Sequence, residues 1–301
     1  MRTDFILPAV LFIALMAMVV YATTGGHSAD AGAQQLATTP ATCQPSGSLV
    51  KLPDLPEASG LAASERHRDL FWAHNDSSEP TIYAIGADGA LRGRVRVAGA
   101  AVEDWEAITV APCDGGSCVF IGDIGDNNLA RRSIRVFRVP EPSPDDEATA
   151  PATVLEGTYP EGPQDAEGVF LANKSLYVVT KGDNAPVRIY RFPSLASAEP
   201  QQLQLVATVS SSEVGRDGRI TDADVSPDGS WIALRTLESV LFYRSESLLN
   251  GRVDQPLAYD VSALNEPQGE GLAWADPSTL FLAGEGEGGG TFARISCNLP
   301  S

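Results

Sequence analysis

The chain has 301 residues, 43% of them hydrophobic, and a net charge of −18 at pH 7. This length allows a sizeable core, and the negative charge argues against nucleic acid or an anionic membrane surface as a partner. Only three His residues are present, which argues against a His-rich transition-metal site. The composition fits a secreted protein or one that binds cations.

The N-terminal segment is predicted to direct the chain out of the cytoplasm. Residues 5–21 form an apolar run of about the minimum length for spanning a bilayer. Residues 1–21 are therefore expected to be a signal peptide or a membrane anchor, and the sequence leaves both open. Residues 22–46, rich in Ala, Thr, Gly and Gln, resemble a flexible tether. The domain at 47–301 is expected to be extracytoplasmic, either secreted or held at the membrane through residues 5–21.

The four cysteines favour two disulfides, because an even number is typical of an oxidising compartment. Cys113 and Cys118 enclose a turn-rich tetrapeptide, which predicts a small bridge across a hairpin. The remaining pair, Cys43 and Cys297, would then connect the two ends of the globular part.

Internal repeats dominate the chain from residue 48 onward. Each unit has an acidic strand, an apolar strand and an aromatic strand, and a more variable fourth strand follows in four of the five units. The apolar strands lie at 70–73, 119–122, 176–179, 231–234 and 280–283. Five units of this kind predict an all-β fold, a five-bladed β-propeller. A six-bladed ring is the alternative, and it would need a unit that the sequence does not show.

The fifth unit lacks a fourth strand because the chain ends at Ser301. Ser48–Leu52 belongs to no unit and has an extended composition. We expect this segment to pair as the outer strand of the last blade, closing the ring, with a Cys43–Cys297 bridge locking the closure.

The acidic strands carry the candidate site. Each repeat places two polar residues at i and i+2, which share one side of a strand. Since the first strand of each blade lines the channel, these pairs should converge near one axis. The ten positions are Glu57, Ser59, Asp104, Glu106, Asp165, Glu167, Asp222, Asp224, Gln268 and Glu270.

Eight carboxylates at equivalent positions favour a bound hard cation, because like charges at close range are costly unless a cation neutralises them. Oxygen-only ligation selects calcium or magnesium over zinc. The sequence therefore predicts calcium; the metal ligands expected are Asp104, Glu106, Asp165, Glu167, Asp222, Asp224 and Glu270. For any single pair, backbone hydrogen bonding or solvation is the alternative explanation.

Three cationic or titratable side chains at the ends of the second strands complete the candidate site: His74, Lys181 and Arg235. Beside a metal they could hold a phosphate or carboxylate group. The alternative is that they only neutralise the carboxylates. For catalysis, Glu106 or Glu167 would activate water.

Several motifs resemble a group of uncharacterised extracytoplasmic bacterial propeller proteins; they are Ser59-Gly60-Leu61, Trp72-Ala73-His74-Asn75-Asp76, Asp104-Trp105-Glu106, Gly122-Asp123-Ile124-Gly125-Asp126-Asn127, Asp165-Ala166-Glu167 and Thr180-Lys181. More remotely, the acidic strands are similar to those of calcium-dependent apyrases and of propeller phytase-like proteins. The apyrase resemblance implies five blades and calcium in the channel. The phosphate-binding pattern of neither family is matched residue by residue.

The sequence supports three functional hypotheses. The first is a calcium-dependent phosphoester or phosphoanhydride hydrolase acting on a small anionic substrate. The second is a non-catalytic propeller that binds an extracellular protein or glycan, and the third is a lactonase-like metal hydrolase. A monomer is expected in each case.

Overall fold

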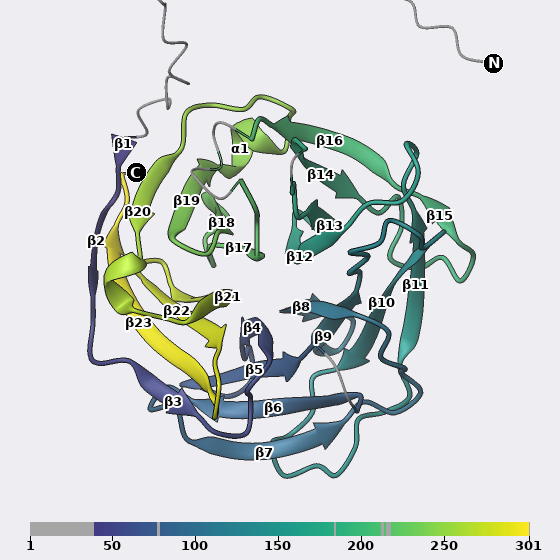
Figure 1. The fold of residues 1–301 in the computed structure, drawn as a ribbon. Helices are drawn as coiled ribbons and strands as arrows, with labels where there is room; N and C mark the ends of the chain where they lie inside the picture. The colour runs from purple at the N-terminus through teal and green to yellow at the C-terminus, as the bar shows by residue number, and fades with distance from the viewer. Residues whose placement is uncertain (1–38, 77–78, 184, 212–213, 215–217, 301) are drawn as a thin grey trace, which may run out of the picture. The chain divides into compact units, whose positions relative to one another are not determined.

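Five antiparallel sheets surround a common axis in the computed structural model (Figure 1). The structure describes residues 39–300, except 77–78, 184, 212–213 and 215–217. The predicted signal peptide or anchor at 1–21 and most of the tether lie outside the described residues. No described helix is long and apolar enough to cross a bilayer.

The blades follow the chain in order. The first blade consists of β4 (Ala58–Ala63), β5 (Leu70–Asn75), β6 (Thr81–Gly86) and β7 (Leu91–Arg96), and the second of β8 (Trp105–Cys113), β9 (Gly116–Asp123), β10 (Ile134–Pro140) and β11 (Thr153–Thr158). The third blade consists of β12 (Ala166–Ala172), β13 (Ser175–Thr180), β14 (Val187–Arg191) and β16 (Gln204–Val209), and the fourth of β17 (Asp222–Val225), β18 (Trp231–Arg235), β19 (Ser239–Arg244) and β20 (Leu257–Asp260). The fifth blade consists of β21 (Gln268–Asp276), β22 (Thr279–Glu285) and β23 (Gly290–Asn298). The prediction of an all-β, five-bladed propeller is confirmed.

The remaining elements are short. They are β1 (Thr39–Pro40), β2 (Thr42–Pro45), β3 (Val50–Leu52), β15 (Gln201–Gln202), the helix α1 (Ser245–Leu248) and the 3-10 helix η1 (Ser262–Leu264). Both β1 and β15 pair in parallel with the outer strand of a blade, β20 and β11 respectively. These pairings cover strand edges that would otherwise offer unpaired backbone groups.

The hydrophobic core lies between neighbouring blades. One buried cluster, for example, joins Phe120 and Val136 of the second blade to Val178 and Tyr190 of the third. Second strands such as β18, which is buried throughout, contact a neighbour on each face. This two-sided burial explains why they appear in the sequence as continuous apolar runs and not as alternating patterns.

The N-terminal segment pairs with the last strand of the fifth blade. Val50–Leu52 lies antiparallel to Gly290–Phe292, and Thr42–Pro45 lies antiparallel to Ile295–Asn298. The Cys43–Cys297 disulfide joins directly opposed residues of the second pairing. That this pairing is what keeps the ring closed stays a prediction.

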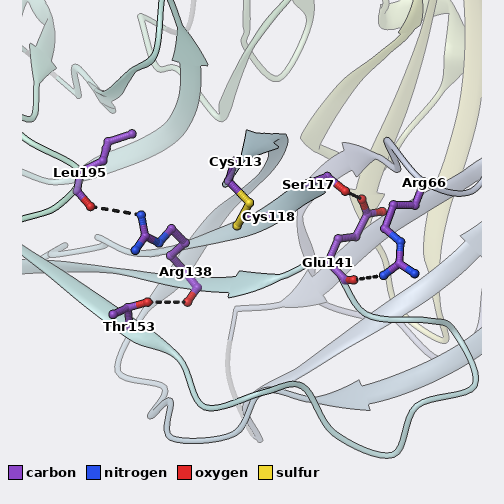
Figure 2. Close-up of a disulfide and its surroundings, with 8 residues drawn as sticks. All are labelled: Arg66, Cys113, Ser117, Cys118, Arg138, Glu141, Thr153 and Leu195. Atoms are coloured by element: carbon purple, nitrogen blue, oxygen red, sulfur yellow. Dashed lines mark hydrogen bonds between the residues drawn. A yellow bond between two sulfur atoms is a disulfide. The ribbon is translucent and has the colours of Figure 1, made fainter. Parts of the chain in front are cut away.

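The second disulfide, Cys113–Cys118, bridges the hairpin between β8 and β9, as expected. It lies beside a buried carboxylate that connects the first two blades (Figure 2). Glu141 is 2% exposed, and it accepts hydrogen bonds from the hydroxyls of Ser64 and Ser117 and from Trp72 Nε1. Because Glu141 is fully satisfied by these donors, it is a structural element and not a free ligand.

Candidate functional site: an acidic cavity at one end of the channel

The inner strands of four blades are interrupted by β-bulges at equivalent points. The register shifts between Ala58 and Gly60, Trp105 and Ala107, Ala166 and Gly168, and Gly269 and Leu272. The residues within these bulges include Ser59, Glu106, Glu167 and Glu270. A bulge leaves its extra residue unpaired and can re-aim the side chain. It therefore explains how these four side chains come together.

A cavity of about 210 Å³ lies where the inner strands begin. Of the described residues that line it, five are carboxylic acids and two are cations; the lining consists of Asp76, Glu106, Asn127, Glu167, Lys181, Arg219, Thr221, Leu237, Gln268, Glu270 and Glu285. The acids come from strands or strand ends of the first, second, third and fifth blades. The cavity is therefore a shared, strongly acidic space at this end of the ring.

Glu106 lies between two neighbouring blades. Its Oε2 accepts a hydrogen bond of 2.9 Å from the Ser59 hydroxyl, and the carboxylate of Asp104 lies close enough for its charge to raise the pKa of Glu106. Gly125 passes directly against both acids, and a Cβ there would lie 2.4 Å from Asp104 Oδ2. Only a glycine therefore allows this close approach of backbone to carboxylates.

Lys181 neutralises part of the acidic cluster. Its Nζ lies 2.5 Å from Glu167 Oε1 and 3.3 Å from Asp165 Oδ2, and it donates a hydrogen bond of 3.4 Å to Asn127 Oδ1. Although burial opposes its charge, Glu167, Asp165 and Glu106 together raise the pKa of Lys181. Lys181 is thus a fixed cation within the cavity, as one of the sequence alternatives expected.

Glu270 carries the contribution of the fifth blade. Its Oε1 accepts a hydrogen bond of 2.7 Å from Gln268 Nε2, and its backbone carbonyl accepts one of 3.1 Å from the hydroxyl of Thr221 on the fourth blade. Glu285, at the end of β22, lies close enough for its charge to raise the pKa of Glu270. The fourth blade therefore supplies a hydroxyl where the others supply carboxylates.

The cavity makes its acids hard to ionise. Burial, and then the negative charge of Glu167 and Asp104, raises the pKa of Glu106 far above its ordinary value. Burial also raises the pKa of Glu167 despite the attraction of Lys181, and it raises that of Glu270 to about 7. An added cation would offset this cost for all three acids.

This electrostatic cost predicts a pH dependence of stability. The pKa of Glu270 is about 7 in the folded chain against an ordinary value of 4.5, so at a pH between these two values the folded state binds more protons than the unfolded state does. The free energy of unfolding therefore falls as the pH rises from about 4.5 to about 7, because the proton that favours the folded state is lost. Glu270→Gln should be more stable than the wild type at a pH of about 8 in chelator, and similar to it at about 5. Thermal unfolding at both values checks this, and an unchanged or lower melting temperature of the variant at the higher pH would contradict it.

Asp222 and Asp224 do not join the cavity. The carboxylate of Asp222 accepts hydrogen bonds from the backbone N–H groups of Ala223 and Leu272, at 2.8 and 2.7 Å. Asp224 similarly accepts from Val225 and Trp274, at 2.8 and 2.9 Å. The strand β17 pairs with β18 without a bulge, and both aspartates hold the next inner strand, β21, in place. For these two residues the backbone explanation describes the structure.

Arg235 and His74 also lie elsewhere. Arg235 is completely buried; its guanidinium contacts the carbonyls of Gly271 and Ala283 and the carboxylate of Glu266. His74 is completely buried beside Trp105, with ring centroids 5.7 Å apart. Burial lowers the pKa of His74 to about 4, so it is neutral at physiological pH. Neither side chain lines the cavity.

Arg219, Thr221 and Leu237 also line the cavity and were not expected from the sequence. Arg219 and Thr221 lie within the three residues before the acidic strand β17. Their position before an inner strand is the one signal that could have indicated them. Glu57, the first acid of the repeat series, is exposed and does not line the cavity.

The described residues contain no group of three or more His, Cys, Asp or Glu side chains already arranged around a metal position. The available donors at the cavity are all carboxylate, amide, hydroxyl or carbonyl oxygens. This donor set matches hard cations such as calcium and magnesium. With Lys181 in its present place, however, the carboxylate of Glu167 is already engaged.

Comparison with solved structures supports the assignment of the fold as a β-propeller. The PQQ-bound aldose sugar dehydrogenase of Streptomyces coelicolor aligns with a TM-score of 0.53 and 12% identity over 87% of this chain and 100% of that chain. Two further structures align less well. They are the hydrazine synthase of Kuenenia stuttgartiensis, with a TM-score of 0.41 and 16% identity over 78% of this chain and 57% of that chain, and the RRP9 WD40 repeats, with a TM-score of 0.42 and 13% identity over 80% of this chain and 67% of that chain.

No protein-family model matches the chain, and no curated protein matches its sequence significantly. A similarity to calcium-dependent apyrases or to phytase-like propellers is not shown by these comparisons. At 12% identity the alignment with the sugar dehydrogenase concerns the fold alone. The chain is therefore a β-propeller by its structure, with no family assigned by its sequence.

Proposed function

We propose that this protein is a monomeric, extracytoplasmic propeller that binds a divalent cation, calcium, in the acidic cavity of its channel. The observation that carries the proposal is the convergence of Glu106, Glu167 and Glu270, from three blades, in one small cavity. All three side chains are less than one-tenth exposed. Burying unpaired carboxylates is costly, and the two cations of the lining leave an excess of acids. The two disulfides are compatible with an extracytoplasmic location.

The donor chemistry supports calcium over zinc. Carboxylate and amide oxygens from Glu106, Glu270, Gln268 and Asn127 are hard ligands, and calcium accepts six to eight of them in flexible geometries. Since Lys181 lies against Glu167 and Asp165, its ammonium would have to withdraw for these two acids to take part. Lys181 would then compete with the metal for the same oxygens.

A metal-dependent hydrolase of small anionic substrates is the second candidate. It is favoured by the two cations, Lys181 and Arg219, which line the same cavity as the acids and could hold a phosphate group. Glu106 or Glu167 would accept the proton of an attacking water. A panel of phosphate esters, nucleotides and lactones, assayed with calcium and with chelator, separates this hydrolase from a lactonase and from a non-catalytic binding module.

Calcium should stabilise the folded chain. An ion that binds only the native state raises its stability by about 2.7 kcal/mol at a hundredfold excess over Kd, so the melting temperature should rise with calcium and fall with chelator. Elemental analysis of the purified protein should find calcium. A protein without any divalent metal, whose melting temperature is unchanged by calcium and by chelator, would contradict the proposal.

A further inference from the structure

A second cavity lies at the opposite ends of the inner strands. Its volume is about 480 Å³, more than twice that of the acidic cavity. It is lined by the last residues of all five inner strands, among them Ala63, Val110, Leu171, Val225 and Trp274. Small-molecule sites commonly have volumes of about 300–1,000 Å³, so this cavity is large enough for an organic ligand.

Part of the wall of this cavity consists of apolar side chains that remain partly exposed. Val110, Leu171, Val225 and Leu249 are each partly exposed. Trp274 is 3% exposed, and its ring packs in the core against Phe242 of the neighbouring blade. The apolar surface that the cavity offers to a ligand is therefore that of the partly exposed residues Val110, Leu171, Val225 and Leu249.

The charge of the cavity has one sign. Glu65, Asp224 and Asp228 contribute carboxylates, and the described residues of the lining include no Lys, Arg or His. The pKa of Asp228 is lowered by hydrogen bonds from Ser226 and Ser230, so it is ionised at neutral pH. Burial raises the pKa of Asp224 to about 7 although backbone hydrogen bonds from Trp274 and Val225 lower it, and the negative charge of Glu65 adds a smaller upward shift. A cation beside Asp224 would favour its ionised form.

We propose that this second cavity binds a small organic cation, an ammonium group on an apolar body. The apolar body would cover the partly exposed residues Val110, Leu171 and Leu249, and the ammonium would lie among the carboxylates of Glu65, Asp224 and Asp228. The site is separate from the acidic cavity, which lies at the other ends of the inner strands, and takes a different ligand, since its described lining combines apolar side chains with carboxylates and holds no cation. It does not depend on calcium.

Three probes of one shape and different charge test this site in the full chain: tryptamine, tryptophol and indole-3-propionate. Calorimetric titration should give the tightest binding for tryptamine, by about tenfold over indole-3-propionate. Glu65→Gln removes an exposed charge without altering a core, and it should weaken tryptamine binding severalfold while leaving tryptophol unaffected. Leu171→Lys places an ammonium in the cavity and should abolish binding of tryptamine.

The control is Glu106→Gln, which alters the acidic cavity and should leave tryptamine binding unchanged. Any of three results would overturn the proposal. These are equal affinity for the three probes, no binding of tryptamine at millimolar concentration, and no effect of Glu65→Gln on tryptamine binding. Loss of tryptamine binding in Glu106→Gln would also overturn it, because the probe would then occupy the acidic cavity.

Discussion

Removing the N-terminal segment through Pro53 should open the ring and cause aggregation. This deletion takes away β2 and β3, which pair with β23, and with them the buried side chain of Leu52. The edge of β23 would then present unpaired backbone groups. The deletion also removes the Cys43–Cys297 bridge, which closes a loop of more than two hundred residues and should contribute up to about 5 kcal/mol on the chain-entropy model.

Two controls separate the strands from the disulfide. A deletion that ends at Thr38 precedes β1 and should melt like the full chain. A full-length Cys43→Ser/Cys297→Ser variant keeps the strands and should lose only the contribution of the bridge. Thermal unfolding and light scattering compare them, with Cys297→Ser added to the longer deletion to avoid a free thiol. If the longer deletion melts like the shorter one, the N-terminal strands do not close the ring.

Replacing Arg235 should destabilise the fold strongly without impairing a site. Arg235 is completely buried and binds the carboxylate of Glu266 at 2.6 Å, and the side chain of Glu266 is itself 3% exposed. Arg235→Met leaves a buried carboxylate without a counter-ion, and loss of one partner of such a pair costs about 3–5 kcal/mol. The melting temperature of Arg235→Met should therefore fall strongly.

The double variant Arg235→Met/Glu266→Met is the control, because removing both charges is much less costly than removing one. Its free energy of unfolding should lie between those of the wild type and of Arg235→Met. Calcium binding per folded molecule should be unchanged in both. A stable Arg235→Met protein with weakened calcium binding would assign Arg235 to the cavity instead.

Much of the fold could be predicted because each repeat has its own apolar strand. Residues 70–73 and 231–234 lie in second strands that are buried on both faces, and such strands leave continuous apolar runs in the sequence. The disulfide Cys113–Cys118 could be predicted because it bridges a local turn. The acids Glu106, Glu167 and Glu270 could be predicted because equivalent positions of repeats converge on one axis.

The rest of the site depends on register, which single strands do not reveal. The bulges that direct Glu106 and Glu167 into the channel cannot be recognised from the spacing of residues in the sequence. The strand β17 has no such bulge, and for this reason Asp222 and Asp224 do not join the other acids. Likewise, Arg235 ends β18, and Lys181 directly follows the last residue of the equivalent strand β13. Arg235 is buried against Glu266 of the linker that enters the next blade, and only the three-dimensional packing distinguishes the two cations.

Calcium titration of the metal-free protein tests the central claim most directly. Calorimetry should show one ion bound per wild-type chain, weaker binding by Glu106→Gln/Glu270→Gln, and tighter binding by Lys181→Met, in which no ammonium competes for Glu167. Glutamine keeps the size of each acid, so a loss of affinity would report the missing charge. Two results would contradict a calcium site in the acidic cavity. One is that neither the wild type nor Lys181→Met binds calcium, and the other is that the wild type and the double variant bind it with equal affinity.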